Sequence, residues 1–151
     1  MLKRFFQPTF QTNFASVSLL VLRVIAGVAF ILHGWGKIQT PFAWLPEGAP
    51  ISIPGFLQFL AAVSEFGGGI CWILGLFMPL ASLGMLITMI VATLVHMLVF
   101  KDPFVNPAIG SSYEPALMYV GVSLALLGVG PGNYSLDRFI FGLKGIRSTK
   151  N

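Results

Sequence analysis

Four long apolar stretches constrain the fold of this chain more than any other feature. They cover about residues 17–36, 56–78, 80–100 and 113–130, and each is near the roughly 20 residues that an α-helix needs to cross a bilayer. They do not alternate polar with apolar residues, which argues against a β-barrel. With 151 residues, 56% hydrophobic and only 9% charged, the chain has room for one compact bundle. The sequence therefore predicts an all-α, integral membrane four-helix bundle.

The basic residues predict how this bundle is oriented. Six of the nine Lys and Arg residues lie in the two tails, and basic residues near helix ends are enriched on the cytoplasmic side. We therefore expect a cytoplasmic N-terminal segment, 1–15, a membrane domain, 16–137, and a basic cytoplasmic tail, 138–151, that lies on the inner surface as an interfacial helix. The loops 38–55 and 101–112 then face outward. No basic patch with interleaved aromatic residues indicates a nucleic-acid partner.

The outward loop 40–55 is too apolar for a flexible linker. It combines proline and glycine with several large apolar side chains. We expect it to lie on the membrane surface or to cap the bundle, with Trp44 at the level of the lipid headgroups.

The single cysteine, Cys71, excludes several redox centres. A dithiol centre needs two thiols, and a cysteine-based zinc or iron-sulfur site needs more. Cys71 is four residues from both Gly67 and Gly75, a spacing typical of small residues that let membrane helices approach closely. We interpret it as a packing residue, so an electron acceptor has to be a bound quinone or a partner protein.

Ionisable residues in or beside the apolar stretches are the main candidates for a functional site, because charge in hydrocarbon normally requires a partner or a polar cavity. They are Arg23, His33, Lys37, Glu65, His96 and Glu114. A helical rise of about 1.5 Å per residue separates Arg23 from Glu65 by only about 8 Å along the membrane normal. We therefore predict an ion pair between these two residues. The other four fall toward the outer boundary.

Two sets of residues recur at helical spacing, so each set shares one helix face. They are Arg23, Gly27, Phe30, Gly34 and Lys37 on the first helix, and Glu65, Gly68, Gly69 and Trp72 on the second. Glycines beside the charges let a helix or a ligand come close. We expect both faces to point inward. Trp72 either lines a wall for a ring-shaped ligand or simply packs in the core.

Several motifs resemble the DoxX family of small bacterial membrane proteins. They are LRVIAGVAFILHGWGKI, SEFGGGICWILGL ahead of a proline, a histidine late in the third stretch, and EPALMYVGVSLALLGVGPGNYSLD. The resemblance covers about residues 16–137 and implies a four-helix, multi-pass protein of the bacterial inner membrane. The family is similar to the membrane subunit of thiosulfate:quinone oxidoreductase, and some members resemble anchors of complexes that handle oxidative and thiol stress. Arg23, Lys37, Glu65 and the Ser135-Leu136-Asp137 end match the family pattern, which assigns them no settled catalytic role.

Three functions from different classes follow. We favour a membrane-embedded subunit of a quinone-linked or thiol/oxidative-stress redox system, in which Lys37 or Arg23 attracts an anionic sulfur substrate and Glu65 and His96 relay protons. The candidate catalytic residues are Glu65, Arg23 and His96, and the candidate quinone-binding residues are Trp72, Phe30, Lys37, His33 and Glu114. The expected partners are the lipid bilayer, a soluble or membrane redox subunit, and a second copy of the chain.

The alternatives are a structural or assembly subunit without its own catalysis and a small-solute or proton carrier. Intramembrane ionisable residues often mark substrate or proton paths, which is the basis for the carrier. A metal site at His33, His96 and Glu114 is a weak further option because the chain has no close-spaced ligand motif. We predict no metal.

Overall fold

The chain folds into helices only over residues 11–141, the part that the computed structural model describes. The helices are α2 (Asn13–Gln39), α3 (Gly55–Leu74), α4 (Met78–Leu94) with its π-helical continuation η1 (Val95–Val99), α5 (Glu114–Val129) and α6 (Leu136–Phe141). Three of these segments, α2, α3 and α4 with η1, are long and apolar enough to cross a membrane, and α5 is a shorter apolar helix. The predicted all-α membrane bundle is confirmed.

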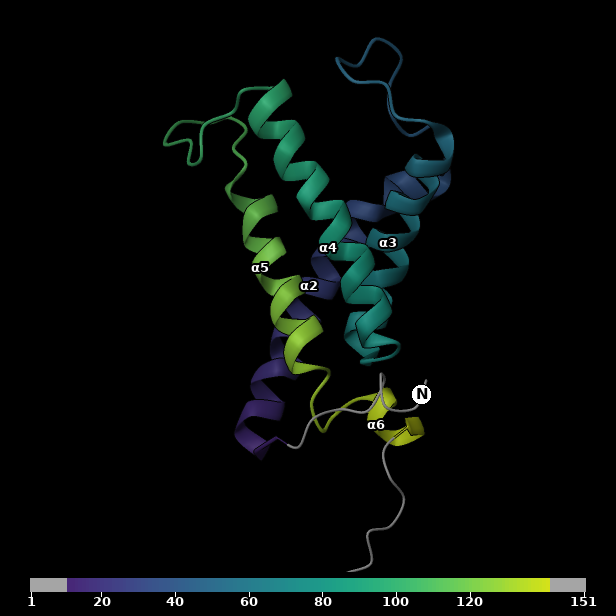
Figure 1. Cartoon of the computed structure of the whole chain (residues 1–151), viewed down its shortest axis with the longest axis vertical. Coiled ribbons are helices and arrows are strands. Elements are labelled where there is room, and N and C mark those ends of the chain that lie inside the picture. Colours follow the sequence, from purple (N-terminus) through teal and green to yellow (C-terminus); the bar gives the residue numbers. More distant parts are fainter. Residues whose placement is uncertain (1–10, 142–151) are drawn as a thin grey trace, which may run out of the picture.

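Helices that follow one another in the chain pack side by side: α2 on α3, α3 on α4, and α4 on α5. The short turn between α3 and α4 lies at the same end of the bundle as α6 and the start of α2, as Figure 1 shows. We call this the turn end, and the opposite end, with loops 40–54 and 100–113, the loop end. The side of the membrane that each end faces stays a prediction, and residues 142–151 of the predicted interfacial tail lie outside the described part of the chain.

The polarity of the bundle is inverted relative to a soluble domain. Large apolar side chains are exposed along every long helix, among them Ile25, Leu32, Leu80, Leu98 and Met118. The interior instead contains buried polar and charged residues, including Arg23, Glu65, Ser82, Ser123 and Asp137. Such an apolar exterior is stable against lipid tails, where helices satisfy their backbone groups internally. The helices therefore contact the bilayer directly.

Helices α2 and α3 touch through their glycines, on the faces that helical spacing predicted. A Cβ atom added at Gly27 would lie 2.7 Å from the carbonyl oxygen of Gly69, and one added at Gly69 would lie 2.8 Å from the carbonyl oxygen of Gly27. Apart from Lys37, which is partly exposed, every residue of the two predicted inward faces is buried. This close approach brings the charged residues of α2 beside α3.

Gly27→Ala should therefore lower the free energy of unfolding by about 1–3 kcal/mol, because the new methyl group meets backbone that cannot move aside. Gly36→Ala is the matched control: a Cβ there meets nothing within 4 Å, and alanine favours a helix by about 1 kcal/mol over glycine. Thermal unfolding of the purified variants in one detergent measures both. Equal melting temperatures for Gly27→Ala and the unsubstituted protein would contradict the close contact.

The turn between α3 and α4 differs from the prediction. Helix α3 ends at Leu74 rather than at residue 78, because Gly75 adopts a left-handed conformation with φ 64° and terminates the helix. Helix α4 then begins at Met78 with Pro79 in its first turn, where proline is tolerated. The turn therefore occupies residues 75–77, whereas the predicted apolar stretches end at residue 78 and resume at residue 80.

Candidate functional site

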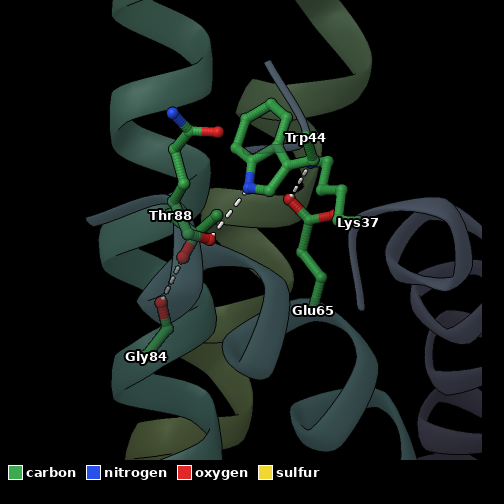
Figure 2. A network of polar contacts seen from close by, with 6 residues as sticks. Lys37, Trp44, Glu65, Gly84 and Thr88 are labelled. Atoms are coloured by element: carbon green, nitrogen blue, oxygen red, sulfur yellow. Dashed lines mark hydrogen bonds and ion pairs between the residues drawn. The ribbon is translucent and has the colours of Figure 1, made fainter. Parts of the chain in front are cut away.

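A partly buried ion pair joins α2 to α3 toward the loop end. The Nζ atom of Lys37 lies 2.6 Å from Oε1 of Glu65, as Figure 2 shows. The side chain of Glu65 is only 2% exposed, whereas that of Lys37 is 27% exposed. The second carboxylate oxygen of Glu65, Oε2, is buried, and no hydrogen-bond donor within residues 11–141 reaches it. Buried polar atoms are rarely left unpaired, so Oε2 is able to accept a hydrogen bond from a bound group.

The loop 40–54 covers this ion pair. Nζ of Lys37 lies 4.6 Å from the centre of the Trp44 ring, a cation–π contact that strengthens where water is excluded. Trp44 in turn donates a hydrogen bond from Nε1 to the carbonyl oxygen of Gln58, 2.8 Å away. Phe42 stacks on Phe59, with ring centroids 5.0 Å apart. The loop is thus packed against α3 and the Lys37–Glu65 pair.

The predicted ion pair between Arg23 and Glu65 is wrong. Lys37 occupies the position at Glu65, and the guanidinium of Arg23 donates all of its hydrogen bonds to main-chain carbonyl oxygens. The two residues lie at similar predicted depths along the membrane normal, but depth does not determine the direction in which each side chain points. Arg23 points to the turn end, where the last carbonyl groups of α3 lack partners within their own helix.

Arg23 connects three segments at the turn end. It contacts the carbonyl oxygens of Trp72 at 2.8 Å and Ile73 at 3.2 Å, at the end of α3. It also contacts those of Pro131 and Tyr134, at 2.9 Å for Tyr134, in the segment after α5. Arg23 is 1% exposed, so this charge is buried, and it makes four hydrogen bonds to main-chain carbonyl oxygens. Arg23 is therefore not available to attract an anionic substrate in this conformation.

Asp137 also joins two segments at the turn end, beside the contacts of Arg23. Its two carboxylate oxygens accept hydrogen bonds from the backbone N–H groups of Phe77 at 2.8 Å and Met78 at 2.9 Å, at the start of α4. A carboxylate at a helix N-terminus satisfies unpaired N–H groups and favours the positive end of the helix dipole. We call Arg23, Gly75 and residues 130–137 the turn-end lock. The GPG-x-x-SLD motif therefore has a structural role in this fold.

The aromatic residues proposed for a quinone wall pack tightly against one another. The rings of Phe30 and Trp72 meet edge to face, with centroids 5.6 Å apart, and Phe30 also meets Tyr119 at 4.6 Å. Phe30 is 1% and Trp72 0% exposed, and Nε1 of Trp72 donates to Oγ of Ser82 at 3.1 Å. These rings form the core between the helices and leave no open face for a ligand in this conformation.

The two histidines and Glu114 do not join the ion pair. Nδ1 of His96, on η1, lies 2.7 Å from Oδ2 of Asp102 at the loop end, and His33 is exposed with its ring 6.4 Å from that of Phe30. Glu114 begins α5. In the part of the chain from 11 to 141, no three His, Cys, Asp or Glu side chains gather as metal ligands would. The proton relay from Glu65 to His96 has no hydrogen-bond link between these two residues in the described part of the chain.

Sequence reasoning missed two contributors to the site region. Gln58 is buried at 8% exposure and holds the loop, although its position seven residues before Glu65 places both on one face of α3. Asp137 was noted only as part of a motif. A polar residue at a helical interval from a buried charge is the signal that could have identified Gln58.

The fold and the buried charges define a small multi-pass helical membrane protein. The chain belongs to the DoxX family, whose pattern it matches over residues 18–98. It is 30% identical over 127 residues to "Inner membrane protein YqjF" of Escherichia coli (strain K12), which covers 82% of this chain and 92% of the relative. It is also 30% identical over 125 residues to "Putative oxidoreductase CatD" of Bacillus subtilis (strain 168), covering 83% of this chain and 88% of that protein. No solved structure matches the chain.

These relatives confirm the family resemblance and the predicted location in the bacterial inner membrane. The family match includes α3, most of α2, and α4 with most of η1, and therefore both Lys37 and Glu65. The turn-end lock draws on residues 130–137, beyond the matched range.

Proposed function

We propose that this protein is the membrane-embedded subunit of a redox system that is quinone-linked or acts in thiol or oxidative stress, and that a quinone headgroup binds at the Lys37–Glu65 pair. The observation that carries the proposal is the unpaired, buried Oε2 of Glu65 beside the ammonium group of Lys37. A site with one donor and one unpaired acceptor is suited to a ligand that presents carbonyl or hydroxyl oxygens. The relative named as an oxidoreductase supports the same class.

The residues present fit the polar part of a quinone. Bound quinone would supply an acceptor for two electrons and two protons, and the electrons would come from a partner subunit that oxidises a thiol or another reduced sulfur compound. Lys37 would donate a hydrogen bond to one ring oxygen. Glu65 would hold or release a proton at Oε2, within the low-dielectric interior where such groups act most strongly. Trp72 and Phe30 would remain core residues of the bundle. They would not form the wall against which the quinone ring binds.

The test is to purify the full-length protein with its native lipids in nanodiscs and to measure bound quinone and co-purifying polypeptides by mass spectrometry. The variant is Lys37→Met with Glu65→Gln. It removes both charges together, so neither charge is left without its ion-pair partner. Loss of one charged and one neutral hydrogen bond should reduce quinone occupancy by about tenfold or more. Lys101→Met, an exposed cation of the other loop, should leave it unchanged. Absence of quinone from the unsubstituted protein would overturn the proposal.

The assembly alternative is favoured by a separate observation, the turn-end lock. Arg23 and Asp137 are fully used in joining segments, as expected of residues that stabilise a scaffold. Partner polypeptides that co-purify equally with the unsubstituted protein and with the double variant, without quinone in either, would indicate a structural subunit.

A further inference from the structure

We infer that Gln58 is a positioning residue that holds Trp44 over Lys37 and Glu65, and that loop 40–54 is the lid of this site. The inference deepens the proposed function, since it rests on the ion pair being a binding site. It concerns how the site is closed and not which ligand enters it.

Gln58 binds the loop at two separate places. Its side-chain oxygen Oε1 accepts a hydrogen bond from the backbone N–H of Leu45 at 3.0 Å, and its Nε2 donates to the carbonyl oxygen of Ile53 at 2.8 Å. Its own carbonyl oxygen accepts the indole N–H of Trp44 at 2.8 Å. Gln58 thus attaches the loop to α3 on both sides of the loop tip, 46–52: through residues 44 and 45 before the tip and through residue 53 after it.

The position of Trp44 depends on this attachment. Trp44 directly precedes Leu45, so the hydrogen bond to Leu45 fixes the backbone from which the indole ring extends. The ring then lies against the ammonium group of Lys37. Because Glu65 is almost completely buried and Lys37 is partly exposed, Lys37 is the exposed component of the pair and Trp44 lies on it. A ligand that approaches the Lys37 ammonium group from the side of loop 40–54 meets this ring first.

The lid is held by few and separable contacts. Besides the three hydrogen bonds of Gln58, the contacts between the loop and the helices include the Phe42–Phe59 stack and the Trp44 ring on Lys37, and most residues of the tip, 46–52, are exposed. Each neutral hydrogen bond contributes little net stability, because water replaces it when the lid opens. Loss of the Gln58 side chain should therefore open the lid without unfolding the bundle.

The reactivity of the Lys37 amine measures lid opening directly. We would treat the full-length protein in nanodiscs with a membrane-impermeant amine-acylating reagent and follow each lysine by peptide mass spectrometry. Lys101, which is exposed on the other loop at the same end, is the internal reference. In the unsubstituted protein Lys37 should react more slowly than Lys101. Gln58→Leu, of similar volume, should raise the ratio about fivefold or more, the change expected for two lost hydrogen bonds.

Gln39→Leu is the matched control, because within residues 11–141 the side-chain amide of Gln39 hydrogen-bonds only to the carbonyl oxygen of Trp35 in its own helix, at 3.3 Å. It should leave the ratio unchanged. Trp44 gives a second test: Trp44→Phe keeps a ring over Lys37 but loses the N–H group, so it should raise the ratio less than Trp44→Ala. If the reactivity of Lys37 relative to Lys101 is the same in Gln58→Leu, in Trp44→Ala and in the unsubstituted protein, loop 40–54 is not a lid. Amine labelling does not require quinone. Absence of quinone from the purified protein would therefore contradict the proposed ligand without affecting the labelling result.

Discussion

Arg23→Met should lower the free energy of unfolding by about 3–5 kcal/mol, the range for breaking a buried charge network. Methionine has similar length but donates no hydrogen bond, so the carbonyl oxygens of Trp72, Ile73, Pro131 and Tyr134 would all lose their partner. These contacts are buried or partly buried, so water replaces the lost donors poorly. We expect little folded protein in the membrane, measured as the fraction that is monodisperse after detergent extraction and as its melting temperature.

Two controls separate the geometry of Arg23 from its charge. Arg23→Lys keeps the charge but lacks the planar fork of donors, so it should fall between the methionine variant and the unsubstituted protein. Lys101→Met removes an exposed cation and should change stability by less than about 0.5 kcal/mol. An Arg23→Met protein that melts at the unsubstituted temperature would show that the turn-end lock contributes nothing to stability.

Lys37→Met should destabilise the protein more than Glu65→Gln does. Without Lys37, the carboxylate of Glu65, 2% exposed, would be left in the interior with no cation, at a cost of about 3–5 kcal/mol. Without the Glu65 charge, Lys37 is still 27% exposed and still lies on the Trp44 ring, so we expect a loss of only about 1–2 kcal/mol. Chemical unfolding in a fixed detergent gives all values on one scale.

The double variant, Lys37→Met with Glu65→Gln, tests whether these costs share one origin. It removes both charges, and replacement of a buried pair by neutral groups is often nearly neutral. The double variant should therefore be more stable than Lys37→Met alone. Additive losses would show that the two residues do not interact.

The two groups of charged residues lie at opposite ends of the bundle and differ in the partners that they bind. At the turn end, the guanidinium of Arg23 and the carboxylate of Asp137 bond to main-chain groups of neighbouring segments. Toward the loop end, the pair is covered by a loop and one carboxylate oxygen has no partner in the described part of the chain. A charge bonded to the main chain on several sides stabilises the packing of those segments, whereas an unpaired carboxylate oxygen beside a partly exposed cation leaves room for a ligand. This contrast is why we propose a ligand site at Glu65 and Lys37 and a structural role for Arg23.

The amino-acid sequence by itself determined the class of fold and the inward faces of the first two long helices. Uninterrupted apolar length identifies membrane helices because the bilayer has one thickness. Spacing of three and four identified the faces with Gly27 and Gly69 because an α-helix has one period. Both properties are local, so neighbouring residues are enough to define them.

Only the tertiary structure decided which charges meet. Arg23, Lys37 and Glu65 share the inward faces, and depth alone favoured Arg23 as the partner of Glu65. Arg23 instead binds residues that are far away in the chain, because Pro131 and Tyr134 bring their carbonyl oxygens to it. Long side chains reach several acceptors at similar depth, and their choice depends on which distant segment packs beside them. That information arises only when the chain is folded.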